Sequence, residues 1–229
     1  MRINKYLAKS GLCSRRKAEQ LVLSGHIKVN DKIIHDLSTI VKEKDIVKYN
    51  DKIILLEEEF EYILLNKPIG YVSTVQDPHA DKTVLDLVKS KNRLFPVGRL
   101  DKDSRGLLIL TNDGDLTYKL THPSGSIKKT YIVKILGFPK EKELNNLREG
   151  IVLEGYKLKP SEIKKKSSNI YEVIISEGRN RQIRKMFEEI NCKVVDLYRI
   201  KIGNISVNGL KEGKYRNLSK EEINYLKEN

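Results

Sequence analysis

FPVGRLDKDSRGLLILTNDG, residues 95–114, is the stretch of this 229-residue chain that decides its fold. Two apolar runs, 95–100 and 106–110, are typical of β-strands and enclose a short segment rich in charge. Within that segment three basic side chains bracket Asp101: Arg99, Lys102 and Arg105. A salt-bridged turn between strands is one interpretation, and a reactive carboxylate held among cations is the other.

Strand and helix patterns alternate around this stretch without a repeat. We expect further strands over 62–65, 130–136, 170–176 and 194–202. We expect helices over 83–90, 115–120, 141–148 and 180–190. The lysine-rich run KKKSSN at 164–169 is interpreted as a solvated loop, and the acidic run EEEFE at 57–61 as a domain junction. The sequence therefore predicts two domains, 1–58 and 61–229.

The N-terminal segment predicts two helices followed by two short strands. INKYLAK, residues 3–9, places Ile3, Tyr6 and Leu7 on one helical face. Ser14 is a typical N-cap for the second helix. Asn30-Asp31 then reads as a turn between HIKVN and KIIHD.

Positive charge favours a polyanionic partner. The formal net charge is +13, from 44 Lys and Arg against 31 Asp and Glu. Three cations occupy the first turn of the second helix, where the helix dipole disfavours them: Arg15, Arg16 and Lys17. This cost is explained if the triplet and the helix N-terminus face phosphate. A solvated basic surface is the alternative.

Several classes of protein are disfavoured. The two cysteines form no CxxC pair, and no apolar run is long enough for a signal peptide or a membrane span. The four histidines are scattered, and the motif DxDxRG at 101–106 lacks the later ligands of a calcium loop. No nucleotide-binding glycine motif is present. We therefore expect a soluble cytoplasmic protein that uses neither a metal nor a cofactor.

Two later segments also combine charge with an apolar face. KKTYIVKI, residues 128–135, predicts a strand with Tyr131 on one face behind a basic entry. EGRNRQIRKMFEEI, residues 177–190, predicts a helix whose apolar face excludes Arg184 or leaves it at the edge. Arg181 lies three residues earlier, so the two arginines can be neighbours. Taken alone, this helix is best explained as amphipathic with a solvated basic face.

Together these segments resemble the pseudouridine synthases of the RsuA/RluB type. GRLDKDSRGLLILTNDG, KKTYIVKI and EGRNRQIRKMF resemble the family's central, tyrosine and basic motifs, in the same order. Residues 3–31 resemble the S4-like (alpha-L) RNA-binding module that is commonly fused to them. The resemblance implies an α+β fold whose catalytic domain has a mixed, mainly antiparallel central sheet with flanking helices and a basic cleft.

The resemblance also implies an activity and roles for residues. The family isomerises uridine to pseudouridine in ribosomal RNA, with Asp101 as nucleophile, Tyr131 packed on the target base and Arg184 paired with the aspartate. Arg99 would lie beside the flipped nucleotide, and Leu197 would line the base pocket. Further RNA contacts are expected from nine residues: Lys5, Arg15, Arg16, Lys17, Lys129, Arg179, Arg181, Gln182 and Lys185. A base must leave its helix before chemistry, and an arginine can fill the vacated space.

The motif variants favour a large-subunit target. GRNRQIRKMF, THPS at 121–124 and GLKEGKYRNL resemble the enzymes of the large subunit, which predicts 23S rRNA and the peptidyl-transferase uridine of the RluB branch. We expect the protein to act as a monomer. A non-catalytic rRNA-binding or ribosome-assembly factor and a 16S rRNA enzyme are the alternatives, while a metal-dependent nuclease lacks ligands.

Overall fold

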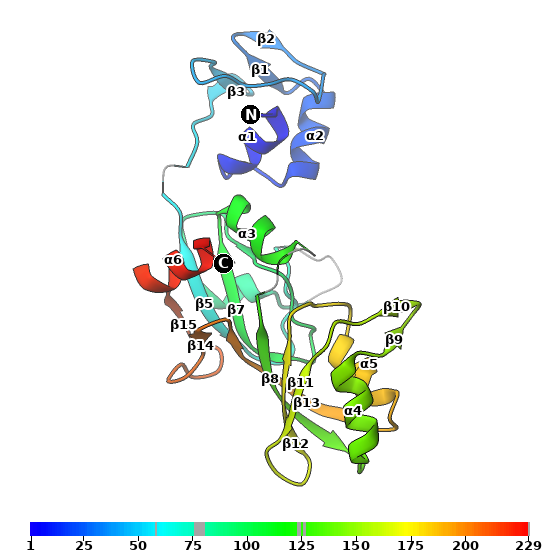
Figure 1. The fold of residues 1–229 in the computed structure, drawn as a ribbon. Coiled ribbons are helices and arrows are strands. Elements are labelled where there is room, and N and C mark those ends of the chain that lie inside the picture. The colour runs from blue at the N-terminus through cyan, green and yellow to red at the C-terminus, as the bar shows by residue number, and fades with distance from the viewer. Residues whose placement is uncertain (58, 76–80, 123–124, 126, 229) are drawn as a thin grey trace. The chain divides into compact units, whose positions relative to one another are not determined.

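The computed structural model describes residues 1–57, 59–75, 81–122, 125 and 127–228. The chain packs as two compact units (Figure 1). The first unit contains Met1–Glu61 with two short later segments, Ser90–Leu94 and Asn112–Gly114. The second unit contains the remaining segments, Tyr62–Lys89, Phe95–Thr111 and Asp115–Asn229.

The first unit is two helices and a small antiparallel sheet. Its elements are α1 (Ile3–Lys9), α2 (Arg15–Leu23), β1 (Ile27–Val29), β2 (Lys32–Ile33), β3 (Val47–Tyr49) and β4 (Lys52–Ile53), with strand order β2-β1-β3-β4. Ile3 and Leu7 of α1 pack with Ala18 of α2 and Ile27 of β1 in one core. The Ser14 side chain accepts a hydrogen bond from the backbone amide of Lys17, at 3.2 Å, and so caps α2 as predicted.

Two tight turns shape this sheet. Asn30 and Asp31 have φ values of 50° and 64°, and Asn50 and Asp51 have 46° and 64°. Consecutive left-handed residues form the hairpin turns whose twist matches the flanking strands. The turn at Asn30-Asp31 is confirmed, and the second hairpin, β3–β4, repeats it without having been predicted.

The second unit is built on one mixed sheet of nine strands. The main path runs β11-β12-β8-β13-β7-β5-β15, in which only β13 and β7 are parallel. The strands on this path are β5 (Tyr62–Lys67), β7 (Arg105–Thr111), β8 (Lys129–Leu136), β11 (Glu162–Lys165), β12 (Ile170–Ile175), β13 (Lys193–Ile202) and β15 (Tyr215–Asn217). β6 (Phe95–Pro96) pairs with β7, and β14 (Ile205–Ser206) with β13. A separate hairpin consists of β9 (Val152–Leu153) and β10 (Tyr156–Lys157).

β5 and β7 are neighbouring strands in the interior of the sheet, and both are buried. Every residue of β5 is buried, as is nearly all of β7. Leu64, Leu107 and Ile109 join one core with Leu116 and Leu226, which come from two helices of the same unit. Such continuously apolar strands belong where both faces of a sheet are covered.

Four α-helices belong to the second unit's part of the chain: α3 (Gly114–Thr121), α4 (Glu141–Glu149), α5 (Gln182–Glu188) and α6 (Lys220–Glu228). The sequence predicted the first three. The helix predicted over 83–90 is instead one 3₁₀ turn, Val84–Leu87, with Thr83 and Asp86 forming its capping box. No helix in the described ranges is long and apolar enough to cross a membrane.

One strand prediction and one loop prediction need correction. The strand predicted over 95–100 stops at Pro96, because Gly98 turns the backbone at φ 71° into the loop that carries Asp101. The run 164–169 is not wholly a loop, because Lys164 and Lys165 extend β11, the edge strand, and pair with Glu172 and Tyr171. Lysines suit an exposed edge strand because their charge discourages further strand pairing.

Candidate active site

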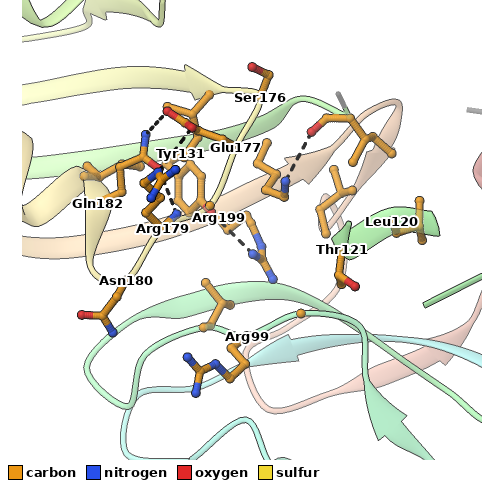
Figure 2. A pocket seen from close by; sticks show the side chains of 18 of the residues that line it. Arg99, Leu120, Thr121, Tyr131, Ser176, Glu177, Arg179, Asn180, Gln182 and Arg199 are labelled. Carbon is orange, nitrogen blue, oxygen red and sulfur yellow. Dashed lines mark hydrogen bonds and ion pairs between the residues drawn. The ribbon is translucent and has the colours of Figure 1, made fainter. Parts of the chain in front are cut away.

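A pocket of about 490 Å³ lies in the second unit, on the part of the sheet that carries β8 and β13 (Figure 2). The loop before β7 lines one part of it, and the segment between β12 and α5 lines another. Eight of the residues predicted from the sequence line this pocket: Arg99, Asp101, Lys129, Tyr131, Arg179, Arg181, Gln182 and Leu197. Tertiary folding therefore brings the three separate motifs to one place.

Lys67 at the end of β5 organises the Asp101 loop. Its side chain is fully buried, and its ammonium donates hydrogen bonds to three backbone carbonyls, those of Pro68 at 3.0 Å, Asp101 at 3.0 Å and Ser104 at 2.7 Å. An ammonium has three donors, so these three acceptors satisfy it. Lys67 thus fixes the backbone on both sides of the loop while the Asp101 side chain remains about one-third exposed.

Burial also perturbs the lysine itself. Removal from water lowers the pKa of Lys67 to about 8, although the nearby carboxylates of Asp101 and Asp103 act in the opposite direction. The sequence patterns did not point to this residue. A lysine inside the apolar run YILLNK was the available signal, because a lysine is almost never fully buried unless it has partners.

Arg181 supplies a cation close to the Asp101 carboxylate. Its guanidinium binds both carboxylate oxygens of Asp103, each at 3.1 Å, and lies 3.8 Å from the Asp101 carboxylate. Burial acts to raise the pKa of Asp103, but hydrogen bonding by Arg181 and the charges of Arg184 and Arg181 lower it overall. Arg181 has a left-handed backbone, with φ 51°, at the residue before α5. That conformation ends the preceding loop and begins the helix.

Arg184 does not occupy the predicted position. It is buried, with 5% of its surface exposed, rather than lying at the edge of a solvated face. Its guanidinium donates to the carbonyls of Val194 at 3.0 Å and Asp103 at 2.8 Å, and it reaches the Asp103 carboxylate at 3.4 Å. The expected pairing with Asp101 is therefore wrong for the described structure, in which Arg184 supports the loop from behind. Helical periodicity assigns faces but does not show that a carbonyl-rich loop packs over one of them.

Tyr131, Leu197 and Arg199 form the sheet-side wall. Arg199 and Tyr131 are direct cross-strand neighbours, and Leu197 pairs with Val133 in the same ladder. The Arg199 Nε donates to the Leu107 carbonyl at 2.7 Å, and its Nη1 lies 3.5 Å from the Tyr131 hydroxyl. Figure 2 shows the two side chains next to each other. Arg199 is buried. The sequence predicted residues 194–202 only as a strand, so no role was assigned to Arg199.

Gly106 allows this wall to approach the Asp101 loop. It lies opposite Arg199 where β7 and β13 run parallel, with φ 114°. A Cβ atom at this position would lie 2.2 Å from the Arg199 carbonyl oxygen. Any other residue would therefore force the two strands apart or strain the backbone.

Arg105 is one of the three cations that bracket Asp101 in the sequence, and its contacts distinguish the two interpretations of that segment. It does not bridge to Asp101, because its guanidinium binds Asp196 through two bonds, at 2.9 and 2.8 Å. The guanidinium also stacks 4.1 Å from the centre of the Tyr198 ring. The salt-bridged-turn interpretation is therefore wrong for Arg105, whose role is to tie β7 to β13.

Positive charge continues along the pocket. Burial lowers the pKa of Lys129 to about 8, and the neighbouring charge of Arg199 acts in the same direction. Gln182 is buried, donates to Glu177 at 3.2 Å and accepts from the Arg179 amide at 3.0 Å, so it shapes the loop rather than facing solvent. Arg99 is exposed on the loop before β7. Lys185 is half-buried and pairs with Glu154 at 2.7 Å, outside the lining residues.

The remaining predicted RNA contacts belong to the first unit. Arg15, Arg16 and Lys17 are all exposed in the first turn of α2, and no acidic residue shares that turn. Lys5 is half-buried on α1.

Among the histidines considered as ligands, His79 lies outside the described residues, as do Pro123 and Ser124 of the THPS motif. Within the described ranges, no three His, Cys, Asp or Glu side chains gather as a metal site.

Comparison with known proteins identifies this architecture. The sequence model of the RNA pseudouridylate synthase family matches residues 61–189, and that of the S4 domain matches residues 1–47. The chain belongs to the RNA pseudouridylate synthase family. This synthase is 41% identical to the ribosomal large subunit pseudouridine synthase B of Bacillus subtilis, over 99% of this chain and 95% of that protein.

Other relatives support the same assignment. The synthase is 36% identical to the dual-specificity RNA pseudouridine synthase RluF of Escherichia coli, over 97% of this chain and 77% of that protein. A crystal structure of a pseudouridylate synthase superposes with a TM-score of 0.74 at 32% identity, covering 99% of both chains. The predicted fold class, an S4-like domain joined to a mixed, mainly antiparallel sheet with flanking helices, is confirmed.

Proposed function

We propose that this synthase converts one uridine of 23S rRNA, in the peptidyl-transferase region, to pseudouridine. The observation that carries the proposal is the Asp101 carboxylate held 3.8 Å from Arg181 in a pocket that also contains Tyr131. The name of the Bacillus subtilis relative supports a large-subunit target. The reaction breaks the bond between N1 and the ribose, turns the base and joins C5 to the same ribose carbon. C5 gives up its proton and N1 gains one, so the isomerisation requires no net oxidation or hydrolysis.

Asp101 is the proposed nucleophile. A carboxylate attacks as the ionised form, and an adjacent guanidinium favours that form and directs it. Arg181 supplies this cation in place of Arg184, which supports the proposed site through Asp103 and Val194. The Lys67 contacts to the loop backbone hold the carboxylate in position before RNA arrives.

Tyr131 and Arg99 are proposed to handle the base. The target must leave its helix, which costs a few kcal/mol of unstacking. The exposed Arg99 can fill the vacated space, while the Tyr131 ring and Leu197 contact the extruded uracil in the pocket. Arg199 holds the Tyr131 hydroxyl side of this wall, through the 3.5 Å contact described above.

Pseudouridine mapping tests this function. Ribosomal RNA from a strain lacking the gene should gain one pseudouridine when the purified protein is added. Asp101→Asn should abolish that product while RNA affinity stays close to that of the wild type, because the substitution keeps the side chain's shape. Asp103→Asn is the matched control two residues away, and it should retain partial activity. Full turnover by Asp101→Asn would refute the nucleophile, and product in 16S rRNA alone would refute the proposed target.

We also propose that the enzyme works as a cytoplasmic monomer in which an S4-like unit, residues 1–58, and a catalytic unit, residues 61–229, fold separately. The acidic run at the junction supports this division. Light scattering should give the mass of one chain. A stable dimer would contradict the monomer.

A further inference from the structure

The β9–β10 hairpin contributes an aromatic residue to the pocket that the sequence analysis did not single out. Tyr156 begins β10, has 38% of its surface exposed and lines the same pocket as Asp101 and Tyr131. Tyrosine combines a large apolar ring with a polar hydroxyl group, which suits a surface that a ligand covers on binding. The position of Tyr156 in the lining makes its ring available to a ligand in that pocket.

Arg179 stacks on this ring. Its guanidinium carbon lies 3.0 Å from the centre of the Tyr156 ring, and about half of the Arg179 side chain remains exposed. Its ion pair with Glu177 is long, at 3.7 Å. The guanidinium is therefore a flat cationic surface, supported on one side by the Tyr156 ring and partly open to solvent.

The hairpin is held in place before any ligand binds. Glu154 and Gly155 form its two-residue turn, with φ values of 50° and 78°. The Glu154 carboxylate forms an ion pair with the ammonium of Lys185 in α5, at 2.7 Å. Lys185 was predicted to contact RNA, and its contact in the structure gives it the different role of fastening the hairpin to α5. The hairpin that carries Tyr156 is thus tied to α5, which lowers the entropy lost on binding.

We propose that Arg179 and Tyr156 form a stacking platform for an unpaired base that adjoins the target uridine in the RNA chain. This inference rests on the proposed function, because it requires the uridine to occupy the pocket beside Asp101. When that uridine is extruded, its neighbours also lose stacking partners. A guanidinium plane or an aromatic ring can replace a stacked base without reading its sequence. Lys159, which also lines the pocket, adds charge suited to the adjoining phosphate.

Binding to modified RNA tests the platform. The probe is a short RNA centred on the mapped uridine, intact or with an abasic sugar at the preceding or the following position. Affinity is measured by fluorescence anisotropy at fixed salt, with Asp101→Asn in every protein so that RNA is not consumed. Tyr156→Ala is compared with Phe138→Ala, the matched control, because Phe138 is 95% exposed and lies outside the pocket lining.

Loss of one stacked base should weaken binding about 5- to 150-fold. Tyr156→Ala should show such a loss of affinity for the intact RNA. The protein that retains Tyr156 should show a similar loss with one of the two abasic RNAs. Combining Tyr156→Ala with that abasic RNA should weaken binding no further than either change alone. Phe138→Ala should bind normally. The platform is refuted if Tyr156→Ala behaves like Phe138→Ala, or if the Tyr156 and abasic losses are additive.

Two further measurements keep the outcome clear. Thermal unfolding checks that Tyr156→Ala is folded, and Tyr156→Leu, which keeps apolar bulk without a ring, should reproduce the loss. Failure of the platform is separable from failure of the proposed function. Absence of pseudouridine in the mapping experiment refutes the function, whereas normal mapping combined with unchanged binding by Tyr156→Ala refutes the platform alone.

Discussion

Replacing Lys67 by Met removes the ammonium that joins three carbonyls around the Asp101 loop while keeping a side chain of similar length. Lys67→Met should therefore loosen the loop without creating a large cavity. We expect two consequences, a lower free energy of unfolding and a lower rate of pseudouridine formation at nearly unchanged RNA affinity. The second follows because the carboxylate of Asp101 would be less well positioned for attack.

The magnitude follows from the three contacts, at 3.0, 3.0 and 2.7 Å. Each hydrogen bond to a charged group contributes about 1.5 to 3 kcal/mol, and the buried charge itself costs several kcal/mol in desolvation. Each buried carbonyl left without its donor costs about 1 to 3 kcal/mol, and the desolvation cost of the ammonium is no longer incurred, so we expect a net loss of about 3 kcal/mol. For a chain of this size we expect the melting temperature to fall by about 10 °C.

Urea and thermal unfolding measure the loss, and Lys102→Met is the matched control. Lys102 is an exposed lysine next to Asp101, so its replacement should change stability by less than about 0.5 kcal/mol. A Lys67→Met protein as stable as Lys102→Met would refute the structural reasoning. Loss of stability with fully retained turnover would refute the link between Lys67 and the position of Asp101.

The pH dependence gives an independent check. The pKa of Lys67 falls from 10.5 to about 8 on folding, so between these values the unfolded chain binds more protons than the folded chain. Lys67 therefore makes the free energy of unfolding rise as pH increases through this window. Met cannot titrate, so the stability deficit of Lys67→Met should grow from pH 8 toward pH 10. A deficit that shrinks over this range would contradict the direction of the pKa shift.

Two further predictions distinguish residues that stabilise the loop around Asp101 from residues that act in catalysis or bind RNA. Arg184→Ala should lower the free energy of unfolding by about 3 kcal/mol, because it leaves the carbonyls of Val194 and Asp103 without their donor. Arg181→Ala should reduce turnover with little loss of stability. Equal melting temperatures of the two variants would contradict this division. Replacing the three α2 cations (Arg15, Arg16 and Lys17) by Ala should weaken rRNA binding and flatten its salt dependence by about one unit of log–log slope per lost phosphate contact. An unchanged salt slope would mean that this turn of α2 does not face phosphate.

The motifs predicted most of the pocket lining but not how its charges pair. Asp101, Tyr131 and Leu197, which the family resemblance places at the site, line one pocket. Arg181 rather than Arg184 approaches Asp101, because a left-handed residue at the start of α5 turns the earlier arginine toward the loop and the later one into the interior. A repeat of 3.6 residues cannot predict that single backbone conformation.

By itself, the sequence determined the elements with strong patterning: the apolar strands β5 and β7, the alternating strand β8, the capped helix α2, and the basic character of the whole chain. Local propensity and burial act along the chain, so their signals are readable there. Only the tertiary structure decided that Lys67 binds the Asp101 loop, that Arg105 binds Asp196, and that Tyr156 enters the pocket from a hairpin. These contacts join residues distant in sequence, and their energies depend on distances and angles that are set only when the strands and helices pack together.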